Sequence, residues 1–130
     1  MNNEKQLLNL VKKYQLLINK PSKELFDEVF AHNSYCTEIA ITDYYQGSEN
    51  VYNNFIIGRL HNRFSQIELI ADEIIINEIS DKLAITIFKY HTDCILRENG
   101  TSTGISGLET QVMIKENDEW RILHVHYSKS

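Results

Sequence analysis

Two histidines lie one residue apart near the C-terminal end of the chain, in the segment Trp120–Ser128. Side chains of a β-strand alternate between its two faces, so His124 and His126 are predicted to share a face with Trp120. That face begins with a large aromatic ring and ends in two imidazoles and a hydroxyl. This gradient predicts the wall of a pocket that is dry at one end and polar at the other.

Two further segments carry charged or amide side chains on one face of a predicted strand. Lys89 and His91 alternate within residues 83–96, and Glu109 and Gln111 alternate within 105–115. If these faces are concave, their polar side chains converge on one cavity, and the helix predicted at 49–63 and the turn before it supply the opposite wall. The complete predicted pocket consists of Tyr44, Tyr45, Asn53, Arg59, Lys89, His91, Glu109, Gln111, Trp120, His124 and His126.

Acid–base chemistry is one hypothesis for such a pocket. Burial raises the pKa of a glutamate toward neutrality, and a histidine nearby exchanges protons close to pH 7. Glu109 with His91 or His124 could therefore move a proton next to a carbonyl group. Two alternatives remain open. The pocket could bind a ligand without reaction, or Glu109 could pair with Lys89 or a histidine for structural reasons.

Metal binding is a weaker hypothesis. His124 and His126, joined by His91 or Glu109, have the ligand types of a zinc site, but we expect no metal and no cofactor. The two cysteines, Cys36 and Cys94, lie far apart in the sequence without a CxxC motif, and we expect free thiols. Cys94 is predicted to face away from the cavity, together with Tyr90 and Thr92.

Composition narrows the classes of partner. The chain has 130 residues, with 13 lysines and arginines against 18 acidic residues, for a net charge of −5. This balance, without a basic cluster, argues against a nucleic-acid partner. No apolar run has membrane-spanning length, and the polar N-terminal residues predict no signal peptide. We therefore expect one domain over 1–130, in a cytoplasmic protein without a membrane partner.

The periodicity predicts an α+β fold. Helices are expected at 4–18, 22–31 and 49–63, a first strand at 34–41, and four antiparallel strands after residue 64. The strand at 65–77 should bend near residues 71–73, where the alternation slips. The predicted architecture packs three N-terminal helices on one face of a curved antiparallel sheet. Because the strand at 83–96 is apolar on both faces at its start, we expect a second copy to cover the other face, giving a homodimer or a larger homo-oligomer.

Two C-terminal stretches resemble a known family. They are Leu108-Glu109-Thr110-Gln111-Val112 and, after a polar turn, Trp120-Arg121-Ile122-Leu123-His124-Val125-His126-Tyr127-Ser128. Together with Tyr45-Gln46-Gly47 and Leu83–Thr92, they resemble the nuclear transport factor 2-like superfamily, which includes the SnoaL-like proteins and ketosteroid isomerase. The similarity is narrower to the association domain of calcium/calmodulin-dependent protein kinase type II and its bacterial relatives, with their E-T-x-V and W-x-x-V-H-x-H-x-S strands.

The resemblance implies a cone-shaped α+β barrel, oligomerisation through the sheet and a pocket at the open end of the cone. The family has a pocket arginine on its central strand, where this chain has His91. That exchange replaces a fixed charge by a titratable one and puts the binding of a carboxylate there in doubt. No kinase motif is present.

The first functional hypothesis is a homo-oligomeric small-molecule-binding domain with a polar-ended hydrophobic cavity and an unknown ligand. One alternative is a cofactor-independent enzyme, an isomerase, cyclase or dehydratase using Glu/His acid–base chemistry. The other is a pure oligomerisation module.

Overall fold

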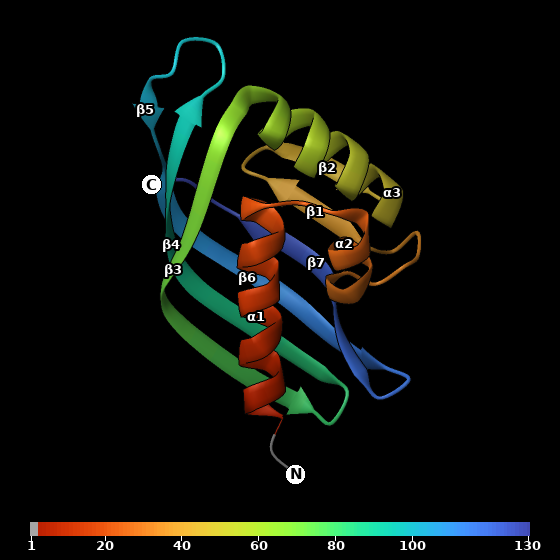
Figure 1. The fold of residues 1–130 in the computed structure, drawn as a ribbon. Helices are drawn as coiled ribbons and strands as arrows, with labels where there is room; N and C mark the ends of the chain where they lie inside the picture. The colour runs from red at the N-terminus through yellow and green to blue at the C-terminus, as the bar shows by residue number, and fades with distance from the viewer. Residues whose placement is uncertain (1–2) are drawn as a thin grey trace.

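The computed structural model describes residues 3–130, and its first two helices form where the apolar periodicity predicts them. Helix α1 spans Glu4–Asn19 and lies across the concave face of the sheet (Figure 1). Its buried stripe consists of Leu7, Leu10, Val11, Tyr14, Leu17 and Ile18. Helix α2 spans Lys23–Val29, and the Ser22 hydroxyl accepts a hydrogen bond from the Leu25 amide at its N-terminus.

The third helix differs from an ordinary α-helix over most of its length. One short turn, α3 (Ser48–Asn50), continues directly into a π-helix, η1 (Val51–His61). The π-helix turns Val51, Phe55 and Ile56 into the core. A helix over 49–63 was predicted, but the apolar spacing did not reveal its wider turn. π-Helices are rare and appear mostly as single-turn bulges, which frequently lie at functional sites.

The sheet is curved and mixed (Figure 1). Its strands are β1 (Thr37–Ala40), β2 (Asp43–Gln46), β3 (Phe64–Ser80), β4 (Leu83–Leu96), β5 (Ser102–Thr103), β6 (Ser106–Glu116) and β7 (Glu119–Tyr127). They lie in the order β2-β1-β7-β6-β4-β3, with β5 beside β4. Every pair is antiparallel except β1 with β7, which is parallel. The turn predicted around Tyr44 is wrong, because these residues form the short, largely exposed edge strand β2.

The predicted bend in β3 is confirmed. Pairing with β4 shifts register between Ala71 and Glu73, which is the signature of a β-bulge. The bend lets the second half of the strand pair continue along the sheet while the first half curls toward η1 (Figure 1). The end of α1 stays bonded to the curled part of β3, because Gln15 donates a hydrogen bond to the Leu69 carbonyl oxygen and the Asn19 side chain accepts one from the Leu69 amide.

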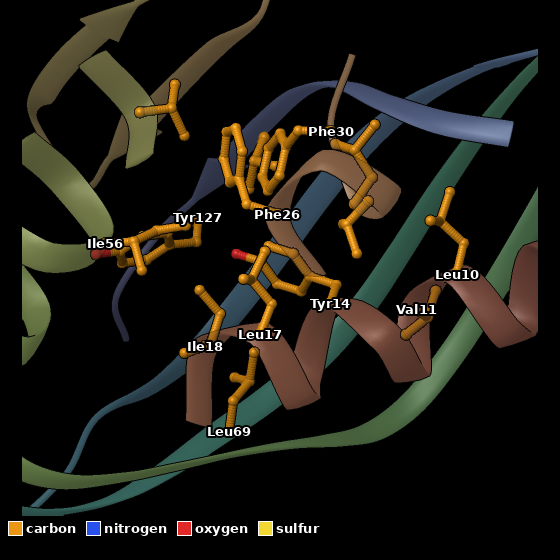
Figure 2. Packing of buried hydrophobic residues seen from close by; sticks show 14 of the residues in the cluster. Leu10, Val11, Tyr14, Leu17, Ile18, Phe26, Phe30, Ile56, Leu69 and Tyr127 are labelled. Carbon is orange, nitrogen blue, oxygen red and sulfur yellow. The ribbon is translucent and has the colours of Figure 1, made fainter. Parts of the chain in front are cut away.

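The core fills the space between the helices and the concave face. Phe26 and Phe30 stack with their ring centroids 4.8 Å apart, and Tyr14 tilts against Phe30 at 6.0 Å. Figure 2 shows Tyr14 reaching from α1 between this aromatic pair and the aliphatic side chains of α1. We call the sheet face toward the helices concave and the other face convex. Across residues 3–130, no helix combines the length and apolar character needed to span a bilayer.

Candidate functional site

A cavity of about 430 Å³ lies where β3 and β4 curl past η1 and the end of α1. Its apolar wall comes from helices and strands alike. These side chains are Ile18, Ile41, Phe55, Leu60, Ile67 and Leu69. Small-molecule sites have this size and character, with a few convergent polar groups among apolar side chains.

Glu109 is the acidic group of this cavity. It projects from the concave face of β6 and is 2% exposed. Its Oε2 accepts a hydrogen bond of 2.7 Å from Nε2 of Gln111, and the Tyr14 hydroxyl donates a second. Burial raises the pKa of Glu109 to about 7, although both hydrogen bonds favour the ionised form. The carboxyl can therefore lose or gain a proton near neutral pH.

Three tyrosines surround this carboxyl. Tyr14, Tyr90 and Tyr127 all line the cavity, and the rings of Tyr90 and Tyr127 meet edge to face at 5.9 Å. The Tyr90 hydroxyl donates a 2.7 Å hydrogen bond to the Ser128 carbonyl oxygen. Burial raises the pKa of Tyr90 to about 12 and raises that of Tyr14 and Tyr127 as well, so these phenols stay neutral hydrogen-bonding groups.

A second buried carboxyl lies on β1. Glu38 is fully buried, and neither of its carboxyl oxygens has a hydrogen-bond partner among residues 3–130. Burial and, next, the nearby Glu109 raise the pKa of Glu38 well above its ordinary value, while Arg59 opposes the shift. An unpaired buried carboxylate is very unfavourable, so the folded protein favours the neutral acid form of Glu38.

Cations gather on the outer part of the cavity lining. Arg59, on η1, forms an ion pair with Asp43 and a hydrogen bond with Tyr45. Arg63 and Lys129 also line the cavity and have exposed side chains, which places them at its opening. The cavity thus runs from two exposed cations, through an apolar middle, to a buried acid.

The fold recurs in known structures. A nuclear transport factor 2-like superfamily protein from Salmonella enterica serovar Typhimurium matches with a TM-score of 0.92 and 26% sequence identity, covering 97% of this chain and 89% of the other. The chain has the nuclear transport factor 2-like fold. A comparison with protein-family models finds no match, and neither does a comparison with curated proteins.

Other proteins with this fold have diverse names. A type 2 hexachlorocyclohexane dehydrochlorinase matches with a TM-score of 0.86 and 12% identity, over 98% of this chain and 85% of its own. A protein from Xanthomonas campestris, described as a calcium/calmodulin-dependent protein kinase II association domain, matches with a TM-score of 0.81 and 13% identity, over 100% of this chain and 89% of its own. At these identities the similarity shows the fold alone. Proteins with the nuclear transport factor 2-like fold thus include one named as an enzyme and one named as an association domain.

Several predicted pocket residues lie in or beside the cavity of this fold. Glu109 and Arg59 line it, and Gln111 is buried against Glu109. Tyr45 packs its ring 5.4 Å from that of Phe55, a lining residue. Trp120 is buried in the core, outside the cavity lining.

Two predicted residues of the opposite wall lie on the surface instead. Tyr44 is exposed on β2, where its hydroxyl bonds to Gln46. Asn53 is exposed on η1 and borders a separate, shallow polar depression. Neither lines the cavity, because the residues around 43–46 form an edge strand and η1 turns Asn53 outward.

The expected orientation of β4 is wrong. Lys89 and His91 lie on the convex face, where Lys89 pairs with Glu73 at 3.6 Å and His91 Nδ1 lies 2.7 Å from Asp72 Oδ2. The hydrogen bond to Asp72 raises the pKa of His91. The concave positions of β4 are Ala84, Thr86, Phe88 and Tyr90, all buried. The cavity side therefore carries Tyr90, and His91 does not take the place of the family's pocket arginine.

The expected orientation of His124 and His126 is wrong as well. Pairing between β6 and β7 passes from Val112–His124 to Met113–Ile122, so Leu123 is an extra residue and a β-bulge reverses the alternation. Trp120 stays concave, but beyond the bulge Val125 and Tyr127 face the core and both histidines face outward. His124 Nδ1 lies 2.6 Å from the Thr37 hydroxyl, and burial lowers the pKa of His124. No three His, Cys, Asp or Glu side chains within residues 3–130 are placed to share a metal ion.

Tyr90, Cys94, Tyr127 and Tyr14 are among the cavity-lining residues that the sequence analysis missed. Tyr90 and Cys94 line the cavity because β4 faces the opposite way from the expectation, so the predicted orientation of Cys94 is also corrected. Tyr127 lines it because of the bulge in β7. Tyr14 belongs to the buried stripe of α1, and nothing in the sequence of that stripe distinguishes a polar cavity contact from an ordinary core residue.

Proposed function

We propose that this protein binds a small molecule with an apolar body and a polar group inside the cavity. The observation that carries the proposal is the position of Glu109. It is a buried carboxyl that faces a cavity of about 430 Å³ with otherwise neutral deep walls. Burying such a group costs free energy unless it is paired, and ionisable groups with strongly shifted pKa values cluster at functional sites.

The neighbours of Glu109 support the same proposal. Gln111 donates to one carboxyl oxygen at 2.7 Å and holds the group in a fixed orientation. Tyr14, Tyr90 and Tyr127 bring neutral hydroxyl groups to the same cavity. Polar groups held by rigid strands, with aliphatic side chains around them, match the general composition of ligand sites.

A matched pair of tryptophan variants tests this proposal. Ile105 lines the cavity rim, whereas Ile57 is an exposed isoleucine on η1 that lies outside the cavity lining. Binding of the neutral fluorescent probe N-phenyl-1-naphthylamine should be saturable in the wild type, weakened at least tenfold in Ile105→Trp and unchanged in Ile57→Trp. Native mass spectrometry of freshly purified wild type and Ile105→Trp would show a retained ligand directly. Equal probe binding by both variants, or no saturable binding by the wild type, would contradict a working cavity.

A second candidate function is cofactor-independent proton transfer, and one observation favours it. The pKa of Glu109 is about 7, which is the range in which a carboxylate acts efficiently as a general base at neutral pH. The Glu/His pair suggested by the sequence is not assembled, because His91 and His124 are convex. The groups beside Glu109 that could donate a hydrogen bond to a developing oxyanion are the tyrosines.

Deuterium exchange would separate this function from simple binding. Ketones and esters with acidic α-protons can be incubated with the protein in deuterium oxide, and exchange followed by proton NMR. An enzyme would accelerate exchange in the wild type, and Glu109→Gln would lose it while still binding the neutral probe. If the wild type exchanges no faster than buffer across such compounds, Glu109 serves binding.

A further inference from the structure

The charge of the cavity lining is opposite in sign to that of the whole chain. The chain has 13 basic and 18 acidic residues. The lining contains the cations Arg59, Arg63 and Lys129 against the single acidic side chain Glu109. An acidic protein has therefore gathered positive charge around one cavity, and such a field favours an anionic ligand.

Two of these cations are available to a ligand. Arg59 is already paired with Asp43. Neither Arg63 nor Lys129 forms an ion pair within the described part of the chain, and both side chains are exposed. The Arg63 guanidinium lies 5.1 Å from the ring centroid of Phe64, which also lines the cavity. This cation–π contact holds Arg63 at the boundary between the apolar wall and solvent.

The deep end of the cavity suits a different group. Glu109 lies there with the neutral phenols of Tyr14 and Tyr127, and no cation of the lining pairs with it. An anion placed against Glu109 would be repelled by the ionised carboxyl, whereas a hydroxyl or carbonyl can bond to it or to the phenols. The polarity of the cavity therefore fixes which end of an amphipathic ligand enters first.

We propose that the ligand is an organic monoanion with an apolar ring or chain, bound with its anionic group against Arg63 and Lys129 and its apolar body inward. This inference rests on the proposed binding function and deepens it by naming the ligand class and orientation. Arg63 and Lys129 then act as specificity residues, and Phe55, Leu60 and Ile67 contact the apolar body.

Two probes with one skeleton test the inference. They are 8-anilino-1-naphthalenesulfonate, an anion, and N-phenyl-1-naphthylamine, which lacks only the sulfonate. Arg63→Gln and Lys129→Gln should each weaken binding of the anion about five- to tenfold, as expected for the loss of one partly exposed charge-assisted contact. Both variants should leave binding of the neutral probe within about twofold. Arg63→Lys should restore most of the lost affinity for the anion.

Lys89→Gln is the matched control, because it removes one positive charge from the convex face. It should leave both affinities unchanged, and added salt should weaken only the anion. If Arg63→Gln changes both probes equally, changes neither, or does no more than Lys89→Gln, the inferred ligand class is overturned although the cavity still binds. If the Ile105→Trp variant binds both probes as the wild type does, the proposed function itself fails.

Discussion

Nε2 of Gln111 donates a hydrogen bond of 2.7 Å to Oε2 of Glu109, two residues earlier on the same face of β6. Both side chains are buried, and β6 pairs with β4 without a register shift from Ser106 to Ile114. The strand therefore holds the amide and the carboxyl together whether or not a ligand is bound. This fixed pair makes the ionisation of Glu109 a property of the fold, and it can be measured without knowing the ligand.

We predict that Glu109 makes the protein less stable as the pH rises. Its folded pKa of about 7 lies above the ordinary value of 4.5, so the folded state binds the proton more tightly than the unfolded state. The stabilisation from the protonated carboxyl is complete below about pH 4.5 and is lost as the pH rises to about 7. The expected change in the free energy of unfolding is about 3 kcal/mol.

Urea unfolding at several pH values would test this, with Glu109→Gln as the variant. Between pH 4.5 and 7 the decline should be smaller in the variant by about 3 kcal/mol, since its amide does not titrate. Glu98→Gln in the exposed hairpin tip is the control and should keep the wild-type pH dependence. A Glu109→Gln variant with the same pH dependence as the wild type would show that Glu109 does not titrate in this range.

Tyr14→Phe should raise the pKa of Glu109 further. The Tyr14 hydroxyl donates to the carboxyl and favours its ionised form, so its removal leaves burial less opposed. Carbon-13 NMR of the glutamate carboxyl resonances would follow the titration in both proteins. An unchanged midpoint would mean that the Tyr14 hydroxyl does not contact Glu109 in solution.

Glu38→Gln should stabilise the protein above neutral pH. The buried Glu38 carboxyl must stay protonated in the folded state, and this requirement costs more free energy as the pH rises above the unfolded pKa. Replacing it by a neutral amide removes that cost, with an expected gain on the order of 1–3 kcal/mol at pH 8 and little change at pH 4. Thermal unfolding at the two pH values would measure it, and an equal loss of stability at both would indicate that Glu38 has an unrecognised partner.

The sequence could place β6 correctly because nothing interrupts its alternation around Glu109 and Gln111. It could not orient β4, whose first residues are apolar on both faces, so that Ile85 and Ala84 are equally good candidates for the core. It could not reveal the bulge at Leu123 either. The alternation of residue types in the sequence continues through a bulge, but the side chains after it face the opposite side of the sheet. The family resemblance supplied the fold, but the cavity-facing side of two strands depended on pairing geometry.

Gly104 is predicted to be irreplaceable at the cavity rim. A Cβ atom there would lie 2.0 Å from the carbonyl oxygen of Thr92, so the connection between β4 and β6 would have to move. Gly104→Ala should lower the free energy of unfolding by roughly 2 kcal/mol or more and weaken probe binding. Gly100→Ala is the comparison, since Gly100 has a φ of +71° but open space around it, and its cost should be nearer to about 1 kcal/mol, without an effect on binding. Equal losses of unfolding free energy in both variants would show that the backbone around Gly104 can shift to accommodate a Cβ atom.

The pairing of two copies through the convex face stays a prediction. The structural observation that supports it is a set of exposed apolar side chains on that face. Ile75 on β3 is 50% exposed and Leu108 on β6 is 51% exposed, and Ile87 on β4 lies on the same face between them. A sheet face with large exposed apolar side chains is typical of an interface.

We expect light scattering after size-exclusion chromatography to show a dimer or larger assembly for the wild type and dissociation in Leu108→Lys. Leu16 on α1 is also 51% exposed, so Leu16→Lys is a matched control that should leave the assembly intact. A wild-type protein that is monomeric at high concentration would contradict the prediction, and the exposed convex face would then need a different partner.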